Sequence, residues 1–154
     1  LKAALDAVVL IRSDVPEDAF TANTLGTERM GNGVVIRDDG LILTIGYLIT
    51  EAQTLWITTN NGVVVQGHTL AYDQTSGFGL VLPLGRLGVP MLERGSIRSV
   101  NVNDEVVVIG QGGQRHGRSH TKLAASSVLP TPVYWATAGY GHRGRVRSIR
   151  PSVR

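Results

Sequence analysis

His68, His116, His120 and Tyr47 are the side chains whose types and positions could carry chemistry. His116 and His120 are four residues apart, the spacing of two metal ligands on one face of a helix. Glycine and serine intervene, and no carboxylate lies near enough in the sequence to complete a site. We therefore expect neither a metal nor another cofactor, and the question of catalysis falls on Tyr47.

The other candidates have simpler interpretations. His68 lies in a predicted strand, and we interpret it as a surface or half-buried residue rather than a base. Gln111-Gly112-Gly113 follows a strand, but no helical pattern follows it, as a phosphate-binding loop would require. The Arg/Gly-rich stretch 141–147 resembles a nucleic-acid tail with few aromatic neighbours. We favour a solvated basic end over a nucleic-acid binder.

The composition fits one compact domain or two small halves. The chain has 154 residues, of which 42% are apolar and 18% charged, and 19 are glycines. It has no cysteine, which excludes disulfides, thiolate metal sites and cysteine nucleophiles. No apolar run approaches the roughly 20 residues that span a bilayer. Residues 1–110 carry 7 basic and 12 acidic side chains, whereas residues 111–154 carry 8 basic and no acidic ones. The two parts of the chain therefore differ in their balance of basic and acidic residues.

Two hairpins organise the first 110 residues. Strands 34–36 and 41–44 are joined across Asp39-Gly40, and strands 55–58 and 63–66 across Asn61-Gly62, which are both favoured turn pairs. Gly67 predicts a bulge or bend, after which 68–72 extends the fourth strand. Further strands are predicted at 8–11, 79–82 and 105–109, with helical spacing at 1–7 and loops at 13–29 and 84–100. Short strands at this spacing indicate an antiparallel barrel or sandwich. The pattern fades from Gln111 onward, where 128–135 is one candidate strand.

Four motifs follow one another in a recognisable order. They are GNGVVI with DGLILT at 31–36 and 39–44, YDQTSGFGLV at 72–81, VPML with Gly95-Ser96 at 89–96, and NDEVVVIG at 103–110. The series resembles the first barrel of trypsin-like serine peptidases of the HtrA (Deg) type, over about residues 8–110. The resemblance implies an all-β fold, with a trypsin-like antiparallel β-barrel over 8–110 and a second barrel that is incomplete or diverged.

The departures from the family pattern fall on its catalytic triad. The position of the general-base His is Tyr47, and that of the orienting Asp is Gly77. A phenol is a poor base at neutral pH, and glycine has no side chain to orient one. None of the serines lies in the G-x-S-G-G loop that carries the family's nucleophile; the closest, Ser76-Gly77, belongs to the strand motif. The resemblance therefore predicts a degenerate triad and no catalytic residue.

Residues 111–154 are too few for the second barrel, which needs roughly twice that length. Two interpretations stay open: a diverged and shortened remainder, or out-of-frame sequence after a genuine first barrel. The reading frames downstream of the Gly110 codon distinguish them, because a G-x-x-G-G-like segment in another frame would support the second.

Three functions follow from these observations. The first is an inactive peptidase relative, a pseudoprotease that binds a peptide or partner protein. The second is a serine endopeptidase whose nucleophile segment is missing or garbled in this chain, and the third is a basic-tail nucleic-acid binder. Pairing with a second copy would be one way to complete the cleft between barrels.

Because the chain begins at Leu1 rather than Met, we expect a processed or trimmed chain. The resemblance implies a periplasmic or other extracytoplasmic location.

Overall fold

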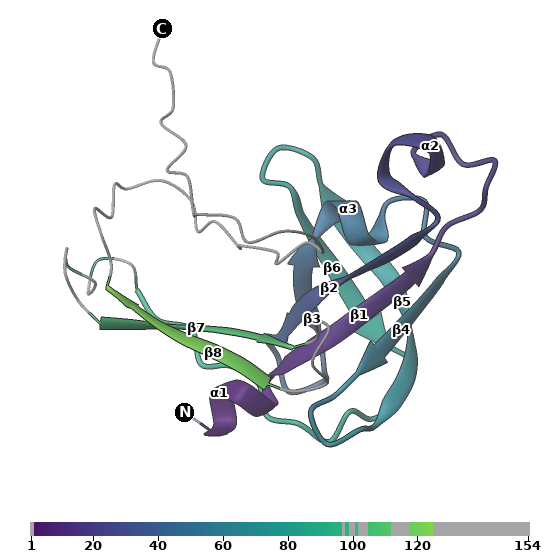
Figure 1. The fold of residues 1–154 in the computed structure, drawn as a ribbon. Coiled ribbons are helices and arrows are strands. Elements are labelled where there is room, and N and C mark those ends of the chain that lie inside the picture. Colours follow the sequence, from purple (N-terminus) through teal and green to yellow (C-terminus); the bar gives the residue numbers. More distant parts are fainter. Residues whose placement is uncertain (1, 97, 99–100, 102–104, 112–117, 125–154) are drawn as a thin grey trace, which may run out of the picture.

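The computed structural model describes residues 2–96, 98, 101, 105–111 and 118–124. Six strands form a closed antiparallel barrel in the order β1-β2-β3-β6-β5-β4 (Figure 1). The barrel strands are β1 (Val8–Asp14), β2 (Glu28–Val35), β3 (Ile42–Ile45), β4 (Thr54–Thr58), β5 (Val64–Asp73) and β6 (Phe78–Pro83). Three short helices accompany them: α1 (Lys2–Asp6), α2 (Ala22–Leu25) and α3 (Gly46–Ile49). The all-β expectation is confirmed.

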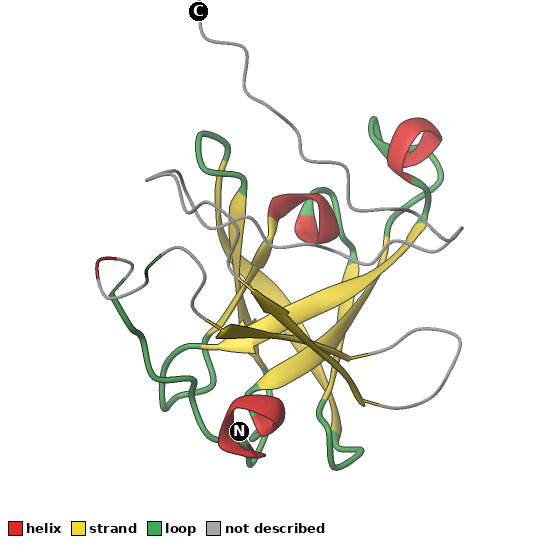
Figure 2. Ribbon diagram, turned by 60° about the vertical axis from the view of Figure 1, so that its left-hand side comes forward, coloured by secondary structure: helices red, strands yellow, loops and turns green. Residues whose placement is uncertain are grey.

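Strand β1 closes the barrel because it pairs on both of its edges. Leu10 lies opposite Asn32 of β2 on one side and opposite Thr58 of β4 on the other. Helices α2 and α3 lie toward one end of the barrel and α1 toward the other, as Figure 2 shows. The residues that end β3 and form α3 therefore stand at one rim of the barrel.

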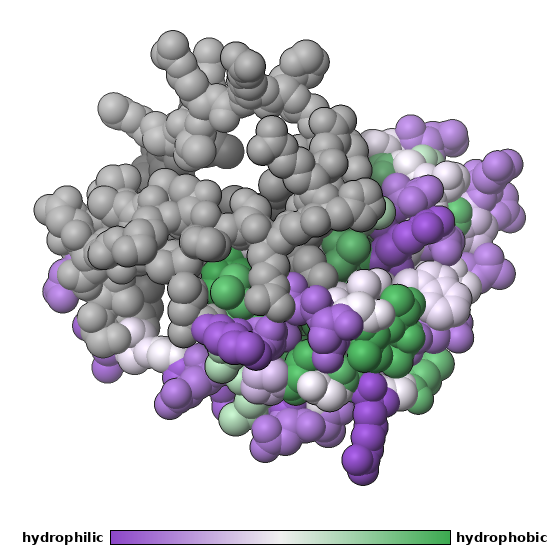
Figure 3. All heavy atoms as spheres, turned by 60° about the horizontal axis from the view of Figure 1, so that its bottom comes forward, coloured by the Kyte–Doolittle hydropathy of each residue, from purple (hydrophilic) through white to green (hydrophobic). Residues whose placement is uncertain are grey.

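Alternate residues of the strands fill the barrel with aliphatic side chains. Ile11, Ile42, Ile57 and Val81 are fully buried, and Leu48 of α3 closes the same cluster from the rim. Period-two burial on antiparallel strands leaves the other set of side chains outside. The outer face that is turned forward in Figure 3 shows hydrophobic patches among hydrophilic residues.

Two glycines keep the barrel interior free of overlap. A Cβ atom on Gly33 would lie 2.5 Å from Ile42 Cγ2 and 2.7 Å from Ile11 Cδ1. A Cβ atom on Gly67 would lie 2.6 Å from Ile57 Cδ1. The expected bulge at Gly67 is wrong: the register shift lies between Thr69 and Ala71, and Gly67 stays paired with Pro83. Gly67 is required for close packing, and the alternative expectation of a bend there stays a prediction.

Both predicted hairpin turns are present. Gly40 and Gly62 have φ values of 88° and 84°, a region that glycine reaches without strain. The limits of the expected loop 13–29 are wrong, because β1 continues to Asp14 and β2 already begins at Glu28. Strand pairing between Asp14 and Glu28 extends the ladder through residues that carry little strand signal in the sequence.

Beyond the barrel, β7 (Glu105–Gln111) and β8 (Arg118–Ala124) form a two-stranded antiparallel sheet. Strand β7 lies against β1 and β2. It runs through Gly110, where the sequence pattern predicted its end, and β8 was not expected. The division of the chain at Gly110 stays a prediction, and the candidate strand 128–135 and the Arg/Gly-rich stretch 141–147 lie outside the described residues. No helix in the described part of the chain is long and apolar enough to cross a membrane.

Candidate functional site

Tyr47 lies on α3, the single helical turn that follows β3. Its side chain is half-buried and packs against the barrel core. The hydroxyl donates a hydrogen bond to the backbone carbonyl of Met30 at 3.2 Å. A strand-end aromatic with its ring packed and its hydroxyl paired is a common structural arrangement. The phenol of Tyr47 is thus engaged with the barrel's own backbone.

The residue before Tyr47 is covered by a second tyrosine. A Cβ atom built on Gly46 would lie 1.9 Å from Cε2 of Tyr72, so the Tyr72 ring rests directly on the Gly46 backbone. Tyr72 lies on β5 and is 48% exposed. Glycine at position 46 therefore allows β5 and α3 to approach closely at the rim.

Gly77 lies in the turn between β5 and β6. Its φ is 75°, and a Cβ atom there would meet no heavy atom within 4 Å. The turn is held by Asp73, which accepts hydrogen bonds from Ser76 Oγ at 2.6 Å and from the backbone N–H of Thr75 at 3.0 Å. Position 77 has open space around it, but a left-handed backbone that most L-residues adopt with strain.

The structure brings the surroundings of Tyr47 and Gly77 together. The backbone N–H of Gly46 donates to the carbonyl of Gly77 at 2.7 Å, joining α3 to the β5–β6 turn. Ser76 donates to Asp73 and accepts a long hydrogen bond of 3.4 Å from the backbone N–H of Phe78. Among the hydrogen bonds of the described residues, none joins an imidazole to these groups. The segments that hold Tyr47 and Gly77 are thus joined by a backbone hydrogen bond, but in the described residues no acid–base pair of side chains connects the two positions.

A buried arginine fixes α3 to the neighbouring loop. Arg29 of β2 is only 2% exposed, and its Nη1 donates to the carbonyls of Tyr47 at 2.7 Å and Thr50 at 2.9 Å. Its other nitrogens donate to the carbonyl of Gly26 at 3.2 Å and to Thr21 Oγ1 at 2.7 Å. Sequence reasoning missed Arg29, because an arginine at the start of a strand is usually exposed.

Glu51 extends this network on the solvent side. Its carboxylate accepts hydrogen bonds from the hydroxyl and backbone N–H of Thr21, at 2.5 and 2.8 Å, and from the backbone N–H of Phe20 at 3.0 Å. The Thr21 hydroxyl first, and then these N–H groups and the Arg29 charge, hold the pKa of the Glu51 carboxyl below its usual value. Glu51 has a φ of 58°, so it turns the chain sharply after α3.

The lowered pKa of Glu51 predicts a dependence of stability on pH. A carboxyl whose folded-state pKa is depressed stabilises the fold above its unfolded value, and this contribution is lost as the pH falls through the folded value. The free energy of unfolding should therefore decrease below about pH 4, and decrease less in Glu51→Gln. Urea unfolding at a series of pH values measures both slopes. An unchanged slope in Glu51→Gln would contradict the role of Glu51.

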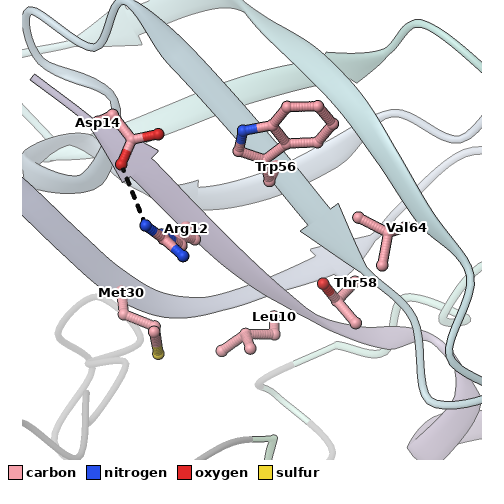
Figure 4. A pocket seen from close by; sticks show the side chains of 7 residues that line it. All are labelled: Leu10, Arg12, Asp14, Met30, Trp56, Thr58 and Val64. Atoms are coloured by element: carbon pink, nitrogen blue, oxygen red, sulfur yellow. Dashed lines mark ion pairs between the residues drawn. The ribbon is translucent and has the colours of Figure 1, made fainter.

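A shallow hollow lies elsewhere, on the outer face of the barrel (Figure 4). It measures about 460 Å³ and is lined by Leu10, Arg12, Asp14, Met30, Trp56, Thr58 and Val64. Arg12 lies between Asp14 and Glu28, with nitrogen–oxygen distances of 3.7 and 3.2 Å. Among the described residues that line the hollow there is neither a histidine nor a serine, and neither Tyr47 nor Gly77 is one of them.

The remaining sequence candidates are dispersed. His68 is exposed on β5, as expected. His120 lies in the strand β8, so the helical geometry assumed for a His116–His120 metal pair is wrong at that end, while His116 lies outside the described residues. Gln111 ends β7, and Gly112 and Gly113 are likewise not described. In the described ranges, no group of three or more His, Asp or Glu side chains could hold a metal ion.

Comparison with known proteins identifies the family. A family model described as a trypsin-like peptidase domain matches residues 31–149. The magnetosome formation protease MamE of Magnetospirillum gryphiswaldense is 26% identical over 108 residues, covering 68% of this chain but only 14% of MamE. The closed six-stranded barrel agrees with this match. The chain therefore belongs to the family of trypsin-like peptidase domains.

Proposed function

We propose that this trypsin-like domain is an HtrA-type pseudoprotease that binds a peptide or a partner protein without cleaving it. The observation that carries the proposal is the hydrogen bond from Tyr47 to the carbonyl of Met30, at the position where the family pattern has its general base. Serine peptidases need an imidazole there to take the proton of the nucleophile. The Tyr47 hydroxyl instead donates a hydrogen bond to a backbone carbonyl.

The environment of Gly77 supports the same proposal. A carboxylate at that position would orient the general base, but glycine has no side chain, and its φ of 75° favours residues that tolerate a left-handed backbone. The nearby carboxylate of Asp73 is already occupied by Ser76 and Thr75 within its own turn. The carboxylate of Asp73 is therefore engaged within its own turn rather than with an imidazole.

A peptidase domain that has lost its catalytic activity can still bind a peptide. The barrel is closed, its core is filled, and the α3 rim is held by Arg29 and by the Gly46–Gly77 hydrogen bond. A rigid scaffold of this kind can hold a peptide in one orientation. The chain spans only 14% of MamE, so the comparison does not identify a partner for the whole protein. That a partner is bound is therefore part of this proposal.

The test uses the full chain with unfolded casein and with a fluorophosphonate probe, beside active trypsin. We expect neither hydrolysis nor labelling, and we expect the same for Tyr47→His combined with Gly77→Asp, because no serine has the context of the family's nucleophile. Labelling of the wild-type chain would overturn the proposal.

The second candidate is a serine endopeptidase whose nucleophile segment is missing or garbled in this chain. It is favoured by the retained framework that joins Tyr47 and Gly77 through the Gly46–Gly77 hydrogen bond. A frame-checked, full-length gene product that cleaves peptides would establish it.

A further inference from the structure

Strand β5 is longer than the strand that pairs with its outer edge. β4 pairs only with Val64–Gly67, from Thr58 opposite Val64 to Leu55 opposite Gly67. On its other edge β5 pairs with β6 as far as Asp73. Residues 68–73 of β5 therefore continue past the start of β4 with one edge unpaired by any described strand.

The backbone of this segment has no other partner in the described part of the chain. All backbone hydrogen bonds of 68–72 belong to the ladder with β6, and neither a loop nor a side chain bonds to the opposite edge. All six residues from His68 to Asp73 are exposed. An unpaired, uncovered row of N–H and C=O groups is a template for another strand.

The chain before β4 is directed away from this edge. Glu51 has a left-handed backbone, and its carboxylate is held by Thr21 across the rim. Two residues later, the N–H of Gln53 donates to the carbonyl of Asp14 on β1. These contacts attach the segment before β4 to β1, so that β4 begins only at Thr54. The edge of β5 at 68–73 therefore has no neighbouring strand among the described residues.

Of the devices that usually protect an exposed strand, this edge carries a register shift at Leu70 and one charged side chain, Asp73. Residues 68–73 read HTLAYD and contain neither lysine nor proline. Leu70 is the residue skipped at the register shift between Thr69 and Ala71, and it is 50% exposed. Tyr72 is 48% exposed. Leu70 and Tyr72 offer apolar contact beside the free backbone groups.

We propose that the edge of β5 at 68–73 binds an extended peptide segment of a partner protein by strand addition. The main-chain groups of the peptide would pair with those of β5, and its apolar side chains would contact Leu70 and Tyr72. The Tyr72 ring rests on Gly46, so the bound strand would pass next to the α3 rim. This inference rests on the proposed peptide-binding function and names where and how the peptide binds.

The observations favour a peptide over a second copy of the chain. A stable protein interface buries about 800 Å² on each partner, far more than six residues of a strand edge can contribute. An added peptide needs only main-chain hydrogen bonds and a few side-chain contacts. Residues 1–110 have five more acidic than basic side chains, which favours a peptide that alternates apolar and basic residues.

The first experiment tests main-chain pairing with the full chain. The probe is a fluorescein-labelled peptide of about ten residues that alternates valine with lysine or threonine, a length that covers one strand. Two isomers carry N-methyl groups on either the odd or the even residues. Only one set of peptide N–H groups faces β5, so we expect fluorescence anisotropy to show about tenfold or more weaker binding for one isomer. Equal binding by the two isomers, strong or weak, would overturn strand addition.

The second experiment locates the edge with matched variants. Leu70→Lys places a charge on the free edge, whereas Leu84→Lys adds the same charge at an exposed residue outside 68–73. We expect Leu70→Lys to weaken peptide binding about tenfold and Leu84→Lys to leave it unchanged, with equal melting temperatures. Equal effects of the two variants would overturn the location. A wild-type dimer in sedimentation that Leu70→Lys abolishes would instead assign this edge to a second copy.

The outcomes separate this inference from the proposed function. Peptide binding that is insensitive to Leu70→Lys and to N-methylation would leave a binding domain with a different site. Hydrolysis of the peptide would overturn the proposal that the domain is a pseudoprotease. The difference in binding between the two N-methylated isomers would still test strand addition.

Discussion

Replacing Gly33 by alanine is expected to lower the free energy of unfolding by about 3 kcal/mol. The new methyl group would lie 2.5 Å from Ile42 and 2.7 Å from Ile11, and both side chains are fully buried. Neither can move into solvent, so the strands β1 to β3 must shift apart. Because domains of this size are stable by only about 5–15 kcal/mol, the melting temperature should fall by about 10 °C.

Gly95→Ala is the matched control for this substitution. A Cβ atom on Gly95 would meet nothing within 4 Å, and its backbone is not left-handed. We expect unchanged or slightly raised stability there, because alanine restricts the unfolded chain. Thermal and urea unfolding of both variants give the comparison. A Gly33→Ala variant as stable as Gly95→Ala would show that the barrel interior is packed less tightly than these distances require.

Replacing Arg29 by methionine is expected to cost about 3 kcal/mol and to loosen the rim of the barrel. Methionine keeps much of the volume of the side chain but removes every donor. The carbonyls of Tyr47, Thr50 and Gly26 and the hydroxyl of Thr21 would each lose a partner. Hydrogen exchange should accelerate at the amide of Thr50, which closes α3 by donating to Gly46.

Arg37→Met provides the control. Arg37 pairs with Asp39 within one hairpin turn, and its side chain is 58% exposed. Exposed ion pairs contribute little to stability, so the loss should be small and exchange at Thr50 unchanged. Equal losses in the two variants would indicate that the Arg29 network does not stabilise the rim.

The parts of the fold that the sequence predicted are those with local signals. Asp39-Gly40 and Asn61-Gly62 mark their turns because glycine relieves the backbone there. The motif series indicated the trypsin-like family, which the family match confirms. The assignment of Tyr47 and Gly77 to the triad positions comes from motif spacing and stays a prediction; the structure adds only that a hydrogen bond from Gly46 to Gly77 joins their two segments.

The parts that were missed depend on tertiary contacts. Glu28 and Arg29 carry little strand propensity, yet they lie in β2 because Asp14 and Ser13 pair with them. The role of Gly67 follows from the side chain of Ile57 on a neighbouring strand, which a local pattern does not contain. Strand β8 has alternating but mostly polar residues, RSHTKLA, so its pairing with β7 left no clear apolar signal.

The pairing of β1 with β4 has a kinetic consequence. Their partner residues are forty or more positions apart in the chain, so this contact brings a high entropy of loop closure. During synthesis β1 emerges first, and its second edge stays unpaired until β4 is complete. Topologies dominated by such distant pairings fold in about milliseconds to seconds rather than microseconds. The interval between the emergence of β1 and that of β4 is therefore a period in which the nascent chain exposes an unpaired strand edge that can aggregate.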